Sequence, residues 1–437
     1  MMSPLTMKTA VVPPHPVEAD LVITGAGELL TCPAEGKGIG LVVGGAVAAK
    51  DGRVVWVGPA KQLRSRVTLA EGAVIVDAEG RVVMPGLIEC HTHLIFAGDR
   101  SAEFQARIAG ASYQQVALAG GGIASTVRAT RAASDEELRA LALSRLGRLL
   151  SLGVTTVEAK SGYGLSPEQE LRILELYAQL DVIHAIDIVS TLLGAHALPD
   201  DYRGRAEAFL ELVATEMIPA VAERGIARFC DAFCEKGAFS ADQCRSILTV
   251  AAQHGLRSKL HADQLSEGGG AALAAELGAV SADHLDYVSD AGIAALAKSG
   301  VTAVLLPGAA FFLGTEQLAP ARKLLDSGVH VALSTDLNPG SSPTENLWLM
   351  ATMGCCALHM TAAEVIRGIT CEAARALALD REVGSLEVGK KADILILESK
   401  KHTEIPYHYG INPVDQVFKA GKCVSLREPI SKVRPCG

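Results

Sequence analysis

The segment Pro85-Gly-Leu-Ile-Glu-Cys-His-Thr-His93 is an apolar, strand-like run that ends in two histidines separated by one residue. Alternate side chains of a β-strand point to the same side, so His91 and His93 are expected to face one pocket. Imidazole nitrogens are common ligands of divalent metals. The segment therefore predicts a strand whose carboxyl end carries chemistry.

Seven later apolar runs also end in polar side chains, and helical composition follows each of them. The eight runs are residues 83–93, 155–160, 188–196, 228–235, 257–261, 280–284, 302–307 and 329–336. Most of the intervals, roughly 20 to 40 residues, match one strand plus a crossover helix. The chain is therefore predicted to be an α/β protein with a (β/α)8 TIM-like barrel.

Both ends of the chain show the short alternating pattern of β-strands. Such runs occupy residues 20–24, 40–43, 54–57 and 74–76, without helices between them, and residues 392–397 and 414–418. Asp51-Gly52 is typical of a hairpin turn, because glycine tolerates a positive φ. We predict that residues 1–84 and 376–437 form one small β-sandwich domain and that residues 85–375 form the barrel.

Catalytic groups of such barrels lie at the carboxyl ends of the strands. The polar residues at the predicted strand ends include His93, His196, His261, His284 and Asp336. Any one of these residues could instead be an isolated loop or capping residue. Five of them at equivalent strand ends favour a common site. With His91 added, the candidate metal ligands are His91, His93, His261 and Asp336. Three imidazoles and one carboxylate suit zinc or iron and do not separate the two.

The composition restricts the partners. The chain has 40 Lys plus Arg against 49 Asp plus Glu, a net charge of −9, and no cationic cluster that would favour nucleic acid. Its longest apolar run, residues 301–314, is interrupted by Pro307 and Gly308 and is shorter than the roughly 20 residues that span a bilayer. The N-terminus lacks the pattern of a signal peptide. We expect a cytoplasmic protein with neither nucleic acid nor a membrane as its partner.

Several motifs resemble the amidohydrolase superfamily of metal-dependent hydrolases along essentially the whole chain. They are residues 85–93, a lone histidine on a later strand, Ser334-Thr-Asp336 and residues 384–393. Residues 93–100, 119–131, 160–164, 194–196, 261–264 and 336–341 resemble, more narrowly, the enzymes of histidine degradation within it. This resemblance implies hydrolysis of 4-imidazolone-5-propanoate to N-formimidoyl-L-glutamate in a homodimer. Another cyclic amidohydrolase, a deaminase, or a non-catalytic binding protein on an inactive barrel are the alternatives.

The resemblance also implies roles for individual residues. A water activated by one divalent ion, zinc or iron, would open the ring, with Asp336 transferring the proton. His284 would stabilise the developing oxyanion or orient the water. The implied substrate-binding residues are Arg100, Tyr163, His196, Gln264, Asn338, Gly340 and Ser341.

Three of these assignments also rest on chemistry. Arg100 suits the propionate, because a guanidinium binds a carboxylate bidentately. Gln264 stands where some members of the family carry Glu, and an amide cannot act as a base, so it is assigned to binding. Lys160 ends the second predicted strand, whereas the carbamylated lysine of two-metal amidohydrolases is expected on the fourth. We therefore predict a single metal.

Overall fold

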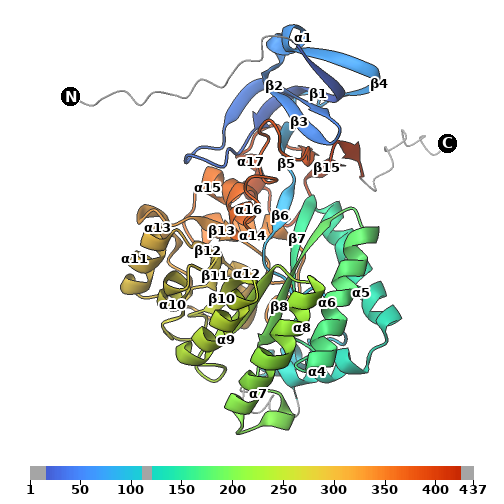
Figure 1. The fold of residues 1–437 in the computed structure, drawn as a ribbon. Coiled ribbons are helices and arrows are strands. Elements are labelled where there is room, and N and C mark those ends of the chain that lie inside the picture. The colour runs from blue at the N-terminus through green and yellow to red at the C-terminus, as the bar shows by residue number, and fades with distance from the viewer. Residues whose placement is uncertain (1–15, 111–120, 425–437) are drawn as a thin grey trace, which may run out of the picture.

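Two sheets of eight strands form the framework of the protein, and the computed structural model describes residues 16–110 and 121–424 (Figure 1). The terminal sheet combines both ends of the chain in the order β16-β15-β14-β5-β1-β2-β3, with β4 paired to β1. Its strands are β1 (Val17–Leu30), β2 (Leu41–Lys50), β3 (Arg53–Pro59), β4 (Val67–Asp77), β5 (Val82–Pro85), β14 (Ile394–Leu397), β15 (Val414–Lys419) and β16 (Lys422–Cys423).

The barrel sheet is parallel throughout and runs in chain order from β6 to β13. Its strands are β6 (Leu87–Glu89), β7 (Val154–Lys160), β8 (Asp187–Ala195), β9 (Phe229–Cys234), β10 (Arg257–Ala262), β11 (Ser281–His284), β12 (Thr302–Leu305) and β13 (Val331–Leu333). Each of the eight predicted runs overlaps one of these strands. The eight-stranded parallel arrangement is therefore confirmed.

The first predicted run, residues 83–93, is not one barrel strand. Met84 of β5 pairs with Leu395 in the terminal sheet, whereas Leu87 of β6 pairs with Val154 in the barrel sheet. Gly86 lies between them, and a Cβ there would collide with the Thr155 side chain. The chain thus passes from one sheet to the other at a glycine.

Contacts between the first and last barrel strands bring the two edges of this curled sheet together. An isolated parallel bridge joins Thr92 to Leu337, and the His93 N–H donates to the Leu337 carbonyl at 2.9 Å. The buried Glu89 carboxylate accepts from the Thr335 N–H at 3.2 Å. These bonds hold the histidine pair next to the segment that carries Asp336.

The chain forms further helices from Ser101 onward, and most of them lie around the barrel sheet (Figure 1). They are α2 (Ser101–Ile108), α4 (Ile123–Ala132), α5 (Asp135–Ser151), α6 (Pro167–Ile183), η2 (Asp200–Tyr202), α7 (Ala206–Leu212), η3 (Val213–Met217), α8 (Ile218–Arg224), α9 (Ala241–Gln253), α10 (Gly270–Glu276), α11 (Asp290–Ser299), α12 (Pro307–Leu313), α13 (Ala321–Asp326), α14 (Leu347–Cys356), α15 (Ala362–Gly368), α16 (Cys371–Ala376) and α17 (Glu404–Tyr407).

Helix α5 shows why such segments are helical. Ser134 caps it by accepting from the Glu137 N–H, and acidic residues fill the first turn, where the helix dipole favours negative charge. Leu138, Ala142 and Leu146 recur at intervals of one helical turn and are buried. One face of the helix therefore packs on the barrel.

The terminal sheet confirms that the two ends of the chain meet, but not that they form a sandwich, because hydrogen bonds join all eight strands into one sheet. The predicted hairpin turn is present, with φ of 50° at Asp51 and 78° at Gly52 between β2 and β3. The expectation of no helices in this region is wrong: η1 (Ala60–Gln62) and α1 (Leu63–Arg66) connect β3 to β4. Within the described part of the chain, no helix is long and apolar enough to cross a bilayer.

Candidate functional site

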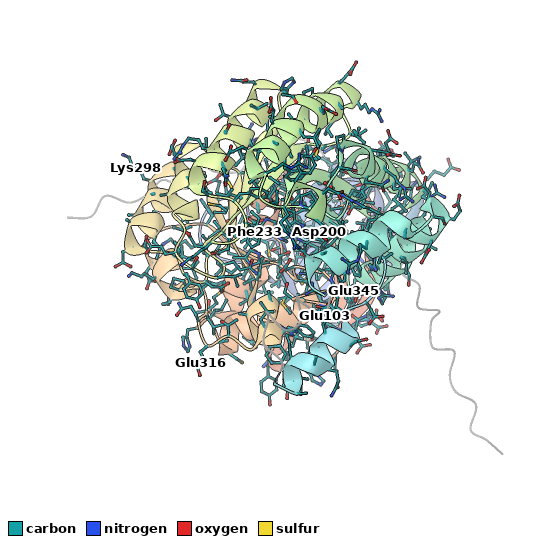
Figure 2. The ribbon with its side chains drawn as sticks, turned by 90° about the horizontal axis from the view of Figure 1, so that it is seen from below. Glu103, Asp200, Phe233, Lys298, Glu316 and Glu345 are labelled. Atoms are coloured by element: carbon teal, nitrogen blue, oxygen red, sulfur yellow. The ribbon has the colours of Figure 1, made fainter. Side chains whose placement is uncertain are left out.

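A cavity of about 250 Å³ opens at the carboxyl ends of the barrel strands, on the side away from the terminal sheet. Figure 2 looks onto this end, with Phe233 of β9 near the middle and Glu103 of α2 nearer the rim. The predicted site residues that line it are His93, Arg100, Tyr163, His196, His261, Gln264, His284, Asp336, Asn338, Gly340 and Ser341. His91 does not line the cavity but is fully buried beside it.

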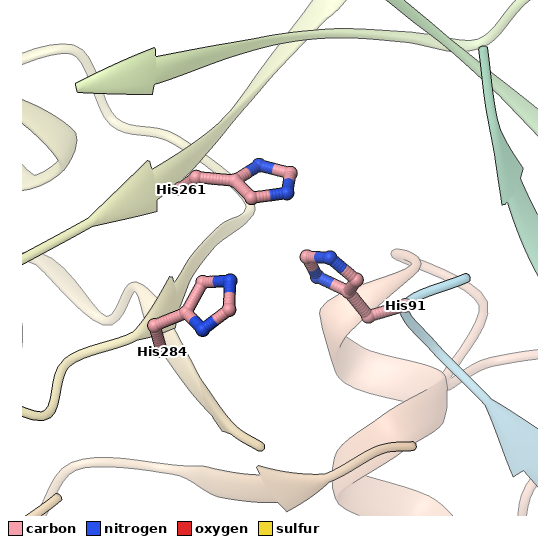
Figure 3. A group of neighbouring side chains, drawn as sticks. All are labelled: His91, His261 and His284. Atoms are coloured by element: carbon pink, nitrogen blue, oxygen red, sulfur yellow. The ribbon is translucent and has the colours of Figure 1, made fainter. Parts of the chain in front are cut away.

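The histidines of this site converge from different strands (Figure 3). The ring centroids of His91 and His261 are 4.5 Å apart, and His284 lies 5.6 Å from His91 and 5.4 Å from His261. The His93 ring is 5.6 Å from His91 and 5.7 Å from His261. All four are at most 3% exposed. Strand ends that are far apart in sequence thus meet at one point.

Asp336 completes the cluster. Its Oδ1 lies 3.4 Å from His91 Nε2 and 3.7 Å from His93 Nε2, and burial raises the pKa of this carboxyl to about 7. Ligand atoms of His91, His93 and Asp336 come together closely enough to hold a metal, and so do those of His91, His261 and His284. Both groups share His91.

The donor atoms of this cluster fit a divalent cation. Within residues 16–110 and 121–424, the buried atoms without a hydrogen-bond partner include His91 Nε2, His93 Nδ1, both ring nitrogens of His261 and His284 Nδ1. Burying a polar atom without a partner is costly, so several together point to a ligand for them. Burial also holds the pKa values of His91, His93 and His284 well below the ordinary value. Neutral imidazole is the form that binds a metal.

Two of these residues have a strained backbone. His284 has a φ of 79° and Asp336 a φ of 56°, in the left-handed region that non-glycine residues seldom adopt. Such conformations persist only where the surrounding structure enforces them, and they concentrate at functional sites. The strain supports a functional rather than a merely structural role for this pair.

Arg100 stands at the mouth of the cavity in a defined position. Its Nε donates to Glu103 Oε2 at 2.8 Å, and Glu103 Oε1 in turn accepts from the Gly122 N–H at 3.0 Å and from Ser125 Oγ at 3.1 Å. A Cβ at Gly340 would overlap the Arg100 guanidinium. Glycine at position 340 therefore leaves space for the arginine side chain. The sequence suggests only that Gly340 binds the substrate.

Tyr163, His196 and Gln264 line the same cavity. The His196 ring stacks on His93 at 5.0 Å, and its Nδ1 lies 2.8 Å from the Gly162 carbonyl, which can only accept. Burial lowers the pKa of His196 to about 4 and raises that of Tyr163. This wall thus offers a neutral imidazole and a protonated hydroxyl.

The segment that follows Asp336 is bonded to itself. The Asn338 side chain donates to the Asp336 carbonyl at 2.7 Å and to Ser341 Oγ at 2.8 Å. Its Oδ1 accepts from the N–H groups of Gly340 and Ser341, each at 2.8 Å. The Asn338 amide and the N–H groups of Gly340 and Ser341, which were expected to bind a substrate, therefore donate hydrogen bonds within this loop.

The structure also reveals charged residues that the sequence analysis missed. Glu158, Asp231, Lys259 and Asp283 lie fully buried beside Lys160 under the histidines. Lys160 Nζ is 2.7 Å from Asp231 Oδ2 and 3.0 Å from Glu158 Oε1. Burial acts to lower the pKa of this lysine, but the surrounding carboxylates outweigh it and raise the pKa. The surrounding carboxylates thus favour the charged ammonium form of Lys160.

Comparisons with known proteins agree with this arrangement. Residues 82–424 match the amidohydrolase family. The imidazolonepropionase of Alkaliphilus oremlandii is 45% identical over 413 residues, which cover 93% of this chain and 98% of the relative. The imidazolonepropionase of Brevibacillus brevis is 50% identical over 390 residues, which cover 88% of this chain and 91% of the relative.

Solved structures with lower sequence identity share the fold. An adenosine deaminase from Xanthomonas campestris with bound zinc has a TM-score of 0.69 at 21% identity, with 93% of each chain covered. A 5-methylcytosine deaminase from Klebsiella pneumoniae has a TM-score of 0.71 at 18% identity, with 94% of this chain and 100% of that chain covered.

Proposed function

Because the chain belongs to the amidohydrolase family, we propose that its cavity catalyses the hydrolytic opening of 4-imidazolone-5-propanoate to N-formimidoyl-L-glutamate. This is the imidazolonepropionase reaction, and the chain matches imidazolonepropionases over about nine-tenths of its length. The observation that carries the proposal is the convergence of the predicted residues on one cavity, with unpartnered histidine nitrogens at its floor.

We propose that His91, His93, His261 and Asp336 hold one divalent ion, zinc or iron. Such an ion would lower the pKa of a water and polarise the ring carbonyl. His284 is the fourth histidine of the cluster, and its buried Nδ1 has no hydrogen-bond partner in the described part of the chain. We assign it to the carbonyl oxygen, where negative charge develops during attack.

Asp336 is the proposed proton carrier. The water oxygen bonds to the ring carbonyl carbon, the adjacent ring C–N bond breaks, and the nitrogen that leaves gains a proton. Asp336 can take that proton from the water and deliver it to the nitrogen, because a carboxylate accepts and a carboxylic acid donates.

The substrate carboxylate is assigned to Arg100, with Tyr163, His196 and Gln264 on the surrounding walls. Asn338 and Ser341 hold the loop beside it, and Gly340 leaves space for the guanidinium. A fixed arginine at the mouth of the cavity favours a cyclic amide substrate that carries a carboxylate over a substrate that carries no charge.

Arg100→Ala is expected to raise KM for 4-imidazolone-5-propanoate by about 10- to 100-fold, because a charge-assisted hydrogen bond contributes about 1.5–3 kcal/mol. The bound metal should be unchanged. Steady-state kinetics with this substrate and with an imidazolone that lacks the propionate provide the test, since only the first should suffer. Arg107→Ala is the matched control, because Arg107 lines the same cavity but packs over the Phe312 ring at 5.3 Å. Equal effects on the two substrates would contradict the assignment of Arg100.

We further infer a closed (β/α)8 barrel in residues 85–375, supported by the Thr92–Leu337 bridge. Residues 1–84 and 376–437 are proposed to form the β-sandwich domain, supported by separate apolar clusters on the two faces of β2. A homodimer in the cytoplasm is the assembly that the family resemblance implies. Neither nucleic acid nor a membrane is proposed as its partner.

A further inference from the structure

A cluster of charged side chains lies beneath the histidines and has no part in the reaction described above. Its members, here called the charge network, are Glu158 and Lys160 of β7, Asp231 of β9, Lys259 of β10 and Asp283 of β11. All five side chains are fully buried. Charged groups are almost never buried completely unless they are paired, so each of these needs an explanation.

Lys160 is the centre of this network. Its ammonium lies 2.7 Å from Asp231 Oδ2, 3.0 Å from Glu158 Oε1 and 3.4 Å from Asp283 Oδ2. It therefore connects carboxylates from three alternate strands of the barrel sheet, β7, β9 and β11.

Two of these carboxylates contact proposed metal ligands. Asp283 Oδ2 lies 2.7 Å from His91 Nδ1. Asp231 Oδ2 lies 3.0 Å from His261 Nδ1, and Asp231 Oδ1 accepts from the His261 N–H at 3.1 Å. Nε2 of both histidines is buried and has no hydrogen-bond partner in the described ranges; His261 Nδ1 has none either, although it lies at ion-pair distance from Asp231. One ammonium thus holds two carboxylates, and each carboxylate faces the Nδ1 of one histidine.

We propose that Lys160 is a positioning residue for metal binding, which acts through Asp283 and Asp231 to orient the rings of His91 and His261 and to present both Nε2 atoms to the ion. Carboxylates behind metal-binding histidines fix the ring and its tautomer in this way. The inference rests on the proposed metal site, and it adds a residue that touches neither metal nor substrate.

The charges of the network support this role. With all five groups charged, two lysines and three carboxylates give the network one net negative charge. A cation at the histidines would offset this charge. Since an uncompensated buried charge is strongly destabilising, the network is arranged for a filled site.

Lys259 provides a comparison within the same network. Its ammonium lies 2.8 Å from Glu158 Oε2 and donates to the Cys90 carbonyl at 3.2 Å. Lys160 and Lys259 are equally buried and share Glu158, but within the described ranges Lys259 forms no ion pair with Asp231 or Asp283. Lys259→Met is therefore a matched control for the loss of a buried lysine.

The test measures the affinity for Zn²⁺ in the absence of substrate, on metal-stripped protein and by competition with a chromogenic chelator. Lys160→Met should weaken Zn²⁺ binding by about 10- to 100-fold, the usual cost of losing a group behind a metal ligand. The visible absorption bands of the Co²⁺ form should shift as well, because the ligand geometry changes. Lys259→Met should bind Zn²⁺ close to the wild-type affinity. Unchanged affinity in Lys160→Met, or equal losses in both variants, would overturn the proposal.

Asp283→Asn and Asp231→Asn keep the inference testable if Lys160→Met does not fold. Each should weaken Zn²⁺ binding, and the loss should be less than additive when Asp283→Asn is combined with Lys160→Met, because both act on His91. Wild-type affinity in both Asn variants would overturn the role of Lys160. A wild-type protein that binds no metal would instead contradict the proposed function.

Discussion

His261→Ala is expected to remove both the bound metal and the activity. His261 is 3% exposed at the centre of the histidine cluster, and its ring faces His91 at 4.5 Å. Alanine offers no ligand atom, and a site with one ligand fewer binds its metal much more weakly. Loss of a single transition-state donor lowers kcat by about 10²–10³-fold. The turnover of His261→Ala should fall by more than this. Elemental analysis and steady-state assay of the same preparation measure both effects.

His254→Ala is the control for this substitution, because His254 is exposed at the end of α9. It should retain metal and activity. A His261→Ala protein that holds a full complement of metal would contradict the proposed ligand set.

Asp336→Asn is expected to lower kcat by about 10²–10⁴-fold, the usual contribution of general acid–base catalysis. The amide has nearly the shape of the carboxyl and one oxygen that can still face the metal, but it cannot take up a proton. KM should change little, since Arg100 and the cavity walls bind the substrate. Steady-state kinetics on metal-replete protein provide the measurement.

Asp286→Asn is the matched control for Asp336→Asn. Burial raises the pKa of Asp286 to about 7, as it does for Asp336, but Asp286 accepts from the Ala319 N–H at 3.1 Å and is not among the cavity-lining residues. The Asp286→Asn protein should keep most of its activity, because the amide oxygen can still accept the hydrogen bond from the Ala319 N–H. A near-normal kcat in Asp336→Asn would show that another group, with His284 the nearest candidate, transfers the proton.

The sequence predicts the barrel strands well because each apolar run ends in a polar side chain at the same edge of the sheet. The passage between the two sheets at Gly86 is not predictable from the local sequence. Residues 82–88 are apolar on both sides of this glycine, and the partners of Met84 and Leu87, which are Leu395 and Val154, lie far away in the chain. Whether the terminal strands form one layer or two likewise depends on pairing across the whole length of the protein.

The cavity residues could be predicted because they lie at strand ends, whereas the charge network could not. A lysine or aspartate within an apolar run does not reveal which strand faces it. The signal was nevertheless present, since buried parallel strands are usually continuously hydrophobic, and Glu158, Asp231 and Asp283 interrupt them. The contact between Arg100 and Gly340 joins the first and last loops, so only the folded chain shows it.

The central claim, hydrolysis of an acid-bearing imidazolone at a metal site, is tested most directly by the ultraviolet decay of freshly prepared 4-imidazolone-5-propanoate. Purified protein should accelerate this decay, with about one metal per chain as a single-metal site requires, and a chelator should abolish the activity. Zinc or iron should restore it. Metal-replete protein that leaves the decay at its spontaneous rate would contradict the proposed substrate, and activity that survives complete removal of the metal would contradict the proposed chemistry.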